Sequence, residues 1–321
     1  MGDYYRDFGS WLRGQFPFRV QKISVDAGFS CPNRDGRIGT GGCVYCDNRT
    51  FNPVYCDPRK RVAEQLADGK RFFAHKYPDM KYLAYFQAFT NTYAPTDRLR
   101  QLYEEALQTE DVVGIVIGTR PDCVSDDLLD YLEELNQQTF LIVEYGVESA
   151  NDETLKRIHR GHDFACAADS VRKTRARGIT TGIHLILGLP GEDEAESLRQ
   201  APIIAALHPD IVKIHQMQVI RGTQLAKTYQ DHPFRIYTVD EYIQLIAHYI
   251  RYLPPEMILE RFVSQSPADK LIAPQWGLKN YQFTHRLNQY LEEKGICQGD
   301  LFSVERTDLL PEKGTEMNQC I

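Results

Sequence analysis

A repeating order of segments between residues 22 and 260 constrains the fold more than any other feature of this sequence. A short run of β-branched or aromatic residues is followed by a turn rich in Gly, Pro or Asp, and then by an amphipathic stretch. This alternation of hydrophobic periods predicts βα units. We expect strands at 22–25, 82–86, 112–117, 140–146, 181–187, 211–214 and 257–260, and helices at 62–76, 97–108, 125–136, 164–177, 195–207 and 239–253.

Seven such strands, joined by right-handed crossovers, predict an α/β fold with a partial parallel barrel that is open on one side. Thr96-Asp97 and Ser125 are start signals for two of the helices, and Asp152-Glu153 is typical of the first turn of a further short helix. We expect an N-terminal extension at 1–18, a core barrel at 19–266 and a C-terminal extension at 267–321 with a helix near 279–294. The last ~15 residues are expected to be mobile.

Charge and hydropathy limit the possible partners. The chain of 321 residues carries 37 Lys and Arg against 44 Asp and Glu, a net charge of -7. Its overall field therefore repels polyanions, and a nucleic acid would have to bind local basic clusters such as those within 59–71 and 156–177. No apolar run approaches the ~18 residues of a membrane span, so we expect a cytoplasmic protein without a membrane partner.

Three of the eight cysteines form a compact motif. Cys31, Cys43 and Cys46 follow the first predicted strand with the spacing C-x11-C-x2-C. Three thiolates can hold a four-iron cluster and leave one iron without a protein ligand, and the glycines of this loop allow close wrapping of the backbone. The alternative is a zinc site closed by Cys56, although zinc ribbons usually combine two close C-x2-C pairs.

Tyr45, the aromatic residue directly before Cys46, completes a pattern that resembles the radical S-adenosylmethionine (SAM) superfamily. The long first spacing is similar to the branch of the Elongator catalytic subunit, and more closely to bacterial proteins of the YhcC/YtqA type. The resemblance covers about residues 19–267. It implies a 4Fe-4S cluster on the three cysteines of the motif and SAM as the second cofactor.

The same resemblance implies a set of SAM contacts at the ends of the predicted strands. The segments that carry it are YFQAFTNTYAP, IVEYGVESAN and GIHLILGLPGE. The implied cofactor-binding residues are Tyr45, Gln87, Thr90, Asn91, Glu144, Glu148, Ser149, Ile186 and Gly188. Two alternatives remain: residues 90–92 could cap the following helix, and the glutamates could form a core ion pair.

Two further segments, IGTRPDCVS and RIHRGHD, resemble the Elongator-like branch. They imply substrate contacts by Arg120, Arg160 and His162 at the mouth of the barrel, with ordinary turn chemistry as the alternative for the first segment. The catalytic residue is unknown. Cys123, as a hydrogen donor to a product radical, and Lys213, in the sixth strand, are candidates.

The resemblance implies an enzyme that cleaves SAM reductively to a 5'-deoxyadenosyl radical, with an electron donor such as flavodoxin or ferredoxin. The Elongator-like features point to a C5 side chain of a wobble uridine in tRNA. Because no acetyltransferase module follows the predicted barrel, trimming or rearrangement of an existing substituent is expected. The alternatives are a radical SAM enzyme that acts on a small metabolite and a non-catalytic, zinc-stabilised binding barrel.

Overall fold

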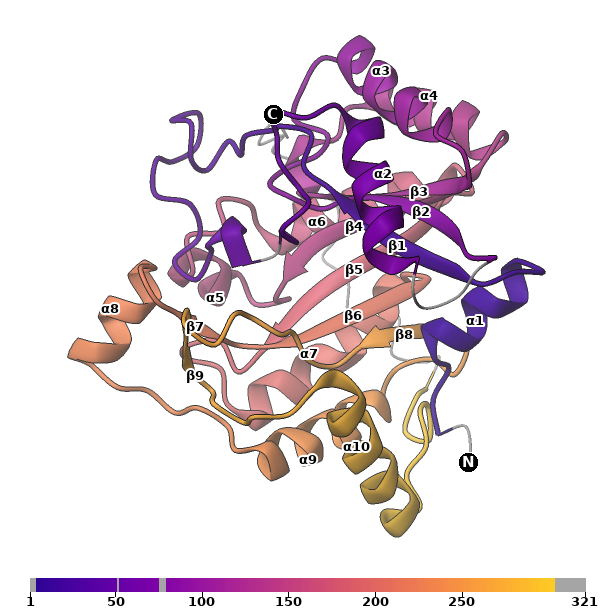
Figure 1. The fold of residues 1–321 in the computed structure, drawn as a ribbon. Coiled ribbons are helices and arrows are strands. Elements are labelled where there is room, and N and C mark those ends of the chain that lie inside the picture. The colour runs from indigo at the N-terminus through magenta and orange to yellow at the C-terminus, as the bar shows by residue number, and fades with distance from the viewer. Residues whose placement is uncertain (1–3, 51, 75–78, 304–321) are drawn as a thin grey trace.

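The computed structural model describes residues 4–50, 52–74 and 79–303. Its central feature is a seven-stranded sheet in the order β1-β2-β3-β4-β5-β6-β8, in which all neighbouring strands are parallel. The strands are β1 (Val20–Val25), β2 (Lys81–Phe86), β3 (Val112–Thr119), β4 (Phe140–Glu148), β5 (Thr180–Leu187), β6 (Ile211–Gln216) and β8 (Ile258–Arg261). The sheet curls into a half-barrel with β1 and β8 at its edges (Figure 1), which confirms the predicted α/β partial barrel.

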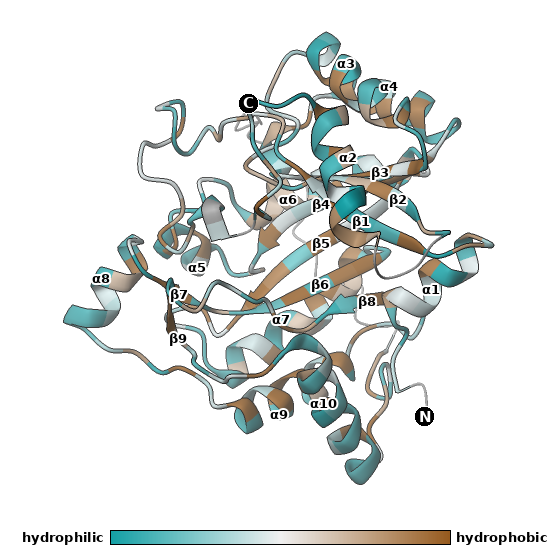
Figure 2. Ribbon diagram, viewed as in Figure 1, coloured by the Kyte–Doolittle hydropathy of each residue, from teal (hydrophilic) through white to brown (hydrophobic). Residues whose placement is uncertain are grey.

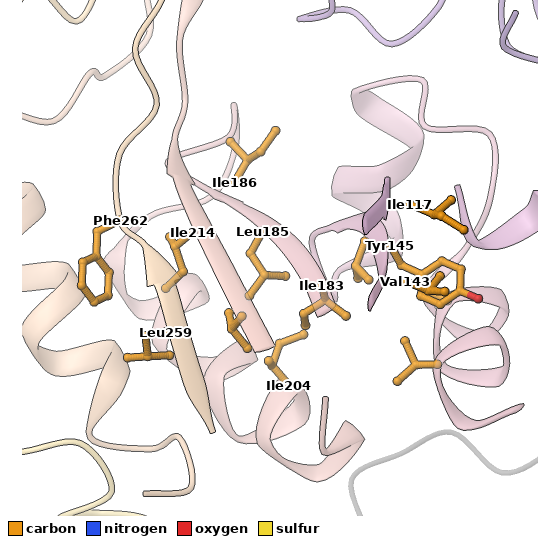
Figure 3. Packing of buried hydrophobic residues seen from close by; sticks show 14 of the residues in the cluster. Ile117, Val143, Tyr145, Ile183, Leu185, Ile186, Ile204, Ile214, Leu259 and Phe262 are labelled. Atoms are coloured by element: carbon orange, nitrogen blue, oxygen red, sulfur yellow. The ribbon is translucent and has the colours of Figure 1, made fainter. Parts of the chain in front are cut away.

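Helices cover the outer face of this sheet. They are α2 (Val62–Phe73), α3 (Thr96–Leu107), α4 (Asp126–Asn136), α5 (Asp152–Arg157), α6 (Phe164–Ala176), α7 (Glu194–Leu207) and α9 (Val239–Ile250). Outward-facing strand residues such as Ile117 and Ile183 are fully buried in one core with Ile204 of α7 (Figure 3). Figure 2 shows hydrophobic residues along the strands. On α3 and α4 it shows both hydrophobic and hydrophilic residues, as expected for amphipathic helices.

Helix starts follow side-chain caps in most cases. Ser125 accepts a hydrogen bond from the backbone of Leu128 and is therefore the N-cap of α4, one residue before the helix. The predicted start at Thr96-Asp97 was wrong in detail, because α3 begins at Thr96 and its N-cap is Pro95, without a side-chain cap. Of the predicted helix 62–76, residues 75–76 lie outside the described residues, as does the tail that we expected to be mobile.

The N-terminal segment contains a helix that the sequence did not predict. In α1 (Phe8–Gln15), Phe8 and Leu12 are buried against inward-facing strand residues that include Val116 and Ile142. The helix is short and contains two glycines, so its hydrophobic period is not distinctive in the sequence. It closes the N-terminal end of the barrel and forms a second apolar cluster there.

A buried ion network joins the two edges of the half-barrel. Lys22 of β1 lies 2.8 Å from Glu144 and 2.9 Å from Glu260 of β8, and Lys213 lies 2.7 Å from Glu144. Burial by itself would raise the pKa of Glu144, but Lys213 and Lys22 outweigh burial and hold that pKa well below its usual value. Side-chain ion pairs therefore connect β1 and β8, which form no backbone hydrogen bonds with each other as strands of the sheet.

Two segments lie at the C-terminal end of the barrel. β7 (Val219–Ile220) and α8 (Gln224–Asp231) follow β6, β9 (Leu271–Ala273) follows β8, and α10 (Asn280–Lys294) packs on α9. The antiparallel β7-β9 pair and α8 were not predicted, whereas α10 confirms the predicted C-terminal helix. In the part of the chain that the structure describes, no helix is long and apolar enough to cross a membrane.

We predict that Leu12→Ala lowers the free energy of unfolding by about 2–4 kcal/mol, because it leaves a cavity between α1 and the floor of the barrel. Urea unfolding monitored by circular dichroism measures this change. Gln15→Ala, at an exposed position of the same helix, is the control and should leave the midpoint unchanged. Equal behaviour of the two variants would show that α1 does not stabilise the barrel.

We predict that Lys213→Met destabilises the fold by about 3–5 kcal/mol, since it removes one cationic partner of the buried Glu144 carboxylate. Lys156→Met, which breaks an exposed pair with Glu153, is the matched control and should have no measurable effect. Thermal unfolding of both variants beside the wild type provides the comparison. A Lys213→Met protein as stable as the control would contradict a structural role for the network.

Candidate active site

A pocket of about 180 Å³ opens at the C-terminal ends of the strands. Its walls come from the loop after β1, from strands β2 to β6, and from the segments that follow β6 and β8. Cys31, Cys43 and Cys46 all line it. This end of a parallel α/β barrel is where active sites are usually found, because the loops after several strands meet there.

The cysteine loop is held by hydrogen bonds from distant segments. The backbone of Val44 donates to Ile158 O at 3.0 Å and accepts from Leu225 at the start of α8 at 2.8 Å. The side chains of Asn33 and Arg160 each donate to Cys43 Sγ at 3.6 Å. Asn48 does the same to Cys46 Sγ at 3.6 Å. Such N–H···S contacts stabilise negative charge on sulfur, as cluster-ligating thiolates require.

Gly42 allows a basic side chain to lie across this loop. Its φ of 74° is in the left-handed region, and a Cβ there would lie 2.8 Å from Arg34 Cζ. The guanidinium of Arg34 donates to Cys46 O at 2.7 Å. A larger residue at position 42 would displace Arg34 from the cysteines.

The structure places Cys56 apart from the other three cysteines of the two predicted metal sites. Within the described part of the chain, no three Cys, His, Asp or Glu side chains converge as ligands of a single metal ion. Cys56 lies outside the pocket lining and donates to Ser24 O at 3.1 Å, and burial raises its pKa to about 12. Cys31, Cys43 and Cys46 remain as three thiols around one pocket, the number that a 4Fe-4S cluster with one open iron would require.

Five of the predicted SAM-binding residues line the same pocket: Tyr45, Gln87, Thr90, Glu148 and Ile186. Thr90 Oγ1 is buried and has no hydrogen-bond partner among the described residues. A buried hydroxyl without a partner is costly in free energy, so a ligand group that pairs with it would be stabilised. The donor set of this pocket therefore fits a polar cofactor beside the cysteines.

Two other predicted SAM contacts, Asn91 and Ser149, do not line the pocket. Asn91 is fully buried and donates to Gly118 O at 2.7 Å, which fixes the loop after β2. Thr92 donates to Cys123 O and α3 has Pro95 at its N-cap, so the proposed capping role of residues 90–92 is wrong. Ser149 donates to Glu192 at 2.6 Å, in the turn that precedes α7.

The last two predicted SAM-binding residues, Glu144 and Gly188, also lie outside the pocket lining. Glu144 is the centre of the ion network beneath the pocket, so the core ion pair considered as an alternative is present. Gly188 has a φ of 85° and packs against Tyr237, where a Cβ would lie 3.1 Å from the ring.

Arg120 and Arg160 reach the pocket from the loops after β3 and α5. Asp122 orients Arg120 through two hydrogen bonds of 2.8 and 2.6 Å. Arg160 donates to Gly146 O, where a Cβ on Gly146 would lie 2.5 Å from the guanidinium. Arg120 Nη1 and Arg160 Nε are buried and without partners among the described residues. Both side chains line the pocket, but these two atoms are themselves enclosed, so they would reach a ligand only after a change of side-chain position.

His162 and the two catalytic candidates do not line the pocket. His162 Nδ1 lies 3.0 Å from Asp163 O, and burial together with Arg160 lowers the pKa of the ring to about 3. Cys123 is buried behind Arg120, and burial raises the pKa of its thiol. Lys213 is bound to Glu144, and burial lowers its pKa.

The pocket also contains polar residues to which the sequence analysis assigned no site role: Tyr85, His184, His215, Gln216, Gln218, Ser264 and Ser266. The alternation of side chains along a strand could have indicated that His184 and His215 face the barrel interior. His184 is two residues from Ile186, and His215 is two residues from Lys213, which are both predicted site residues. Gln216 exchanges hydrogen bonds of 2.9 and 2.7 Å with the backbone of Ser264. This pair of hydrogen bonds joins residues that are 48 positions apart in the chain, so no local sequence pattern could have predicted it.

Family comparisons agree with this geometry. The model of the Radical SAM superfamily matches residues 34–199, and that of the Radical_SAM C-terminal domain matches residues 209–293. The chain belongs to the radical SAM superfamily, whose enzymes use a 4Fe-4S cluster and SAM. The first match begins after Cys31, so the role of that cysteine rests on its position in the pocket.

Individual relatives confirm the branch suggested by the sequence. YtqA of Bacillus subtilis is 39% identical over 93% of this chain and 92% of its own length. A tRNA uridine(34) acetyltransferase of Methanocaldococcus infernus is 27% identical over 57% of this chain and only 34% of its own length. The solved structure of archaeal Elp3 from Methanocaldococcus infernus has a TM-score of 0.64 at 19% identity, covering 88% of this chain and 64% of that one, which supports the fold.

We predict that anaerobic reconstitution loads about four iron atoms per chain and that Cys31→Ala, Cys43→Ala or Cys46→Ala each lowers this content strongly. Iron analysis and the visible absorption spectrum measure the change. Cys56→Ala is the matched control and should keep its iron, since this thiol points to Ser24 O. Stoichiometric zinc that is lost in Cys56→Ala would identify the zinc site instead.

Proposed function

We propose that this chain binds a 4Fe-4S cluster through Cys31, Cys43 and Cys46 and cleaves SAM reductively to act on a C5 side chain of a tRNA wobble uridine. The observation that carries the proposal is the grouping of three thiols, two of them accepting N–H···S contacts, around one pocket at the C-terminal end of the half-barrel. When bound, the cluster would supply the electron that cleaves SAM to methionine and a 5'-deoxyadenosyl radical.

The protein's own residues then have defined tasks. Tyr45, Gln87, Thr90, Glu148 and Ile186 would contact SAM, because they line the pocket beside the cysteines. Arg120 and Arg160 line the pocket and would bind an anionic or carbonyl group of the substrate.

A second task of the pocket is to keep water from the radical. Apolar side chains that include Phe89, Met217 and Ile220 line it beside the polar ones. A radical that abstracts hydrogen from an unreactive C–H bond reacts selectively only when the substrate is held close and solvent is excluded. Two further expectations remain predictions: an electron donor such as flavodoxin or ferredoxin, and a location in the cytoplasm.

Similarity to the tRNA uridine(34) acetyltransferase supports tRNA as the substrate. The chain spans about a third of that protein, so its complete activity is not carried over. We therefore propose the trimming or rearrangement of a substituent that another enzyme has placed on the uridine.

A small metabolite is the second candidate substrate, and the surface charges favour it. Many of the basic side chains that could bind phosphates are paired with acids: Arg59 with Asp57, Lys173 with Asp169, and Arg177 with Asp130. Together with the net charge of -7, this pairing weakens the local attraction for RNA.

We predict that deletion of the gene changes the abundance of a modified wobble uridine, measured by mass spectrometry of total tRNA nucleosides. Expression of the wild-type chain should restore the profile, whereas Cys43→Ala should not, because that variant loses a cluster ligand. An unchanged uridine profile would remove the tRNA proposal. In that case, binding of small metabolites to the SAM-loaded protein is the next measurement.

A further inference from the structure

The floor of the pocket is formed by two polar side chains below the cysteines. Tyr85 of β2 and His184 of β5 line the pocket and both contact the buried carboxylate of Glu144. His184 lies two residues before Ile186 on the same face of β5, so it is about 7 Å deeper in the barrel.

The hydrogen bond to Glu144 fixes the tautomer of this imidazole. His184 Nε2 lies 2.8 Å from Glu144 Oε2, and two lysines keep that carboxylate ionised. Burial and the neighbouring Lys213 lower the pKa of His184, so the ring is neutral near pH 7. From the hydrogen bond we therefore assign the proton to Nε2, which leaves Nδ1 with a free lone pair.

His184 Nδ1 is open to a ligand. It makes no hydrogen bond within the described part of the chain, and it is not among the fully buried atoms that lack partners, so the pocket can reach it. The ring of His215 lies 5.6 Å away, and Arg261 approaches His215 Nε2 at 3.3 Å. With Lys213 and Arg261 close by, a cationic donor is disfavoured, and a neutral N–H group is the suitable partner.

We propose that His184 determines substrate specificity by accepting a hydrogen bond at Nδ1 from a neutral N–H group of the substrate. This inference rests on the proposed function, under which that group is the imide N3–H of the uracil ring. N3 lies across the ring from the C5–C6 edge. An N3–H held at the floor therefore turns the C5 side chain toward the cysteines.

Two substitutions separate this role from the structural contact with Glu144. In His184→Gln, the side-chain amide takes the place of Nε2 and can still donate to Glu144, but the acceptor at the Nδ1 position is lost. In His184→Asn, the amide oxygen takes the place of Nδ1 and keeps an acceptor, while the contact with Glu144 is lost. A purely structural histidine would tolerate the first change better than the second.

The test measures the affinity of the reconstituted, SAM-loaded protein for anticodon stem-loop RNAs that carry uridine or 3-methyluridine at the wobble position. Fluorescence anisotropy without reductant avoids turnover. We expect the wild type to prefer uridine by about tenfold, the usual worth of one hydrogen bond in a pocket. His184→Gln should lose most of this preference and His184→Asn should keep part of it, with iron content and melting temperature as controls.

The outcomes separate the two proposals. If the wild type binds neither RNA, the role of His184 is overturned, whereas the tRNA proposal, whose substrate carries a C5 substituent, is decided by the nucleoside profile of the deletion strain. If it binds both RNAs equally, or if His184→Gln discriminates as well as the wild type, only the role of His184 is overturned. Loss of discrimination in His184→Gln, with uridine binding weakened and 3-methyluridine binding unchanged, supports it.

Discussion

The carboxylate of Glu144 is the interaction on which the rest of the structure depends. It accepts from Lys22 at the first edge of the half-barrel and from Lys213 near the other, and Glu260 of the edge strand β8 completes the network. Buried charges are stable only when they are paired, so these residues must come together for the sheet to curl into the half-barrel. The same carboxylate orients His184 at the floor of the pocket. The curvature of the sheet and the arrangement of the pocket residues therefore depend on the same carboxylate.

The cysteine loop depends equally on distant contacts. Its central residue, Val44, is bound on one side to Ile158 and on the other to Leu225, and Arg160 donates to Cys43. These partners come from both of the segments that the family models match. A loop with many glycines has little conformational preference of its own. Its thiols reach one pocket only because strands, helices and the C-terminal segment hold it from several directions.

Most of the fold could be predicted from the sequence. All seven barrel strands were predicted within a few residues, because strands buried on both faces give continuous apolar runs between turn residues. The misses were α1, α8 and the β7-β9 pair. These elements are short, and their stability comes from packing on the ends of the barrel, which leaves no long periodic pattern to detect.

For the site, the sequence by itself determined the cysteine trio and the strand ends around it, because ligand spacing and hydrophobic period are local properties of the chain. Only the tertiary structure decided which neighbours face the pocket. It places His184 and His215 there, while Ser149 and Lys213 point into the protein. The irregular pairing at the end of β4, where Glu148 has a φ of 72°, redirects side chains that a regular alternation would place differently. Such directions depend on register and on contacts between remote segments, and these form only when the barrel is assembled.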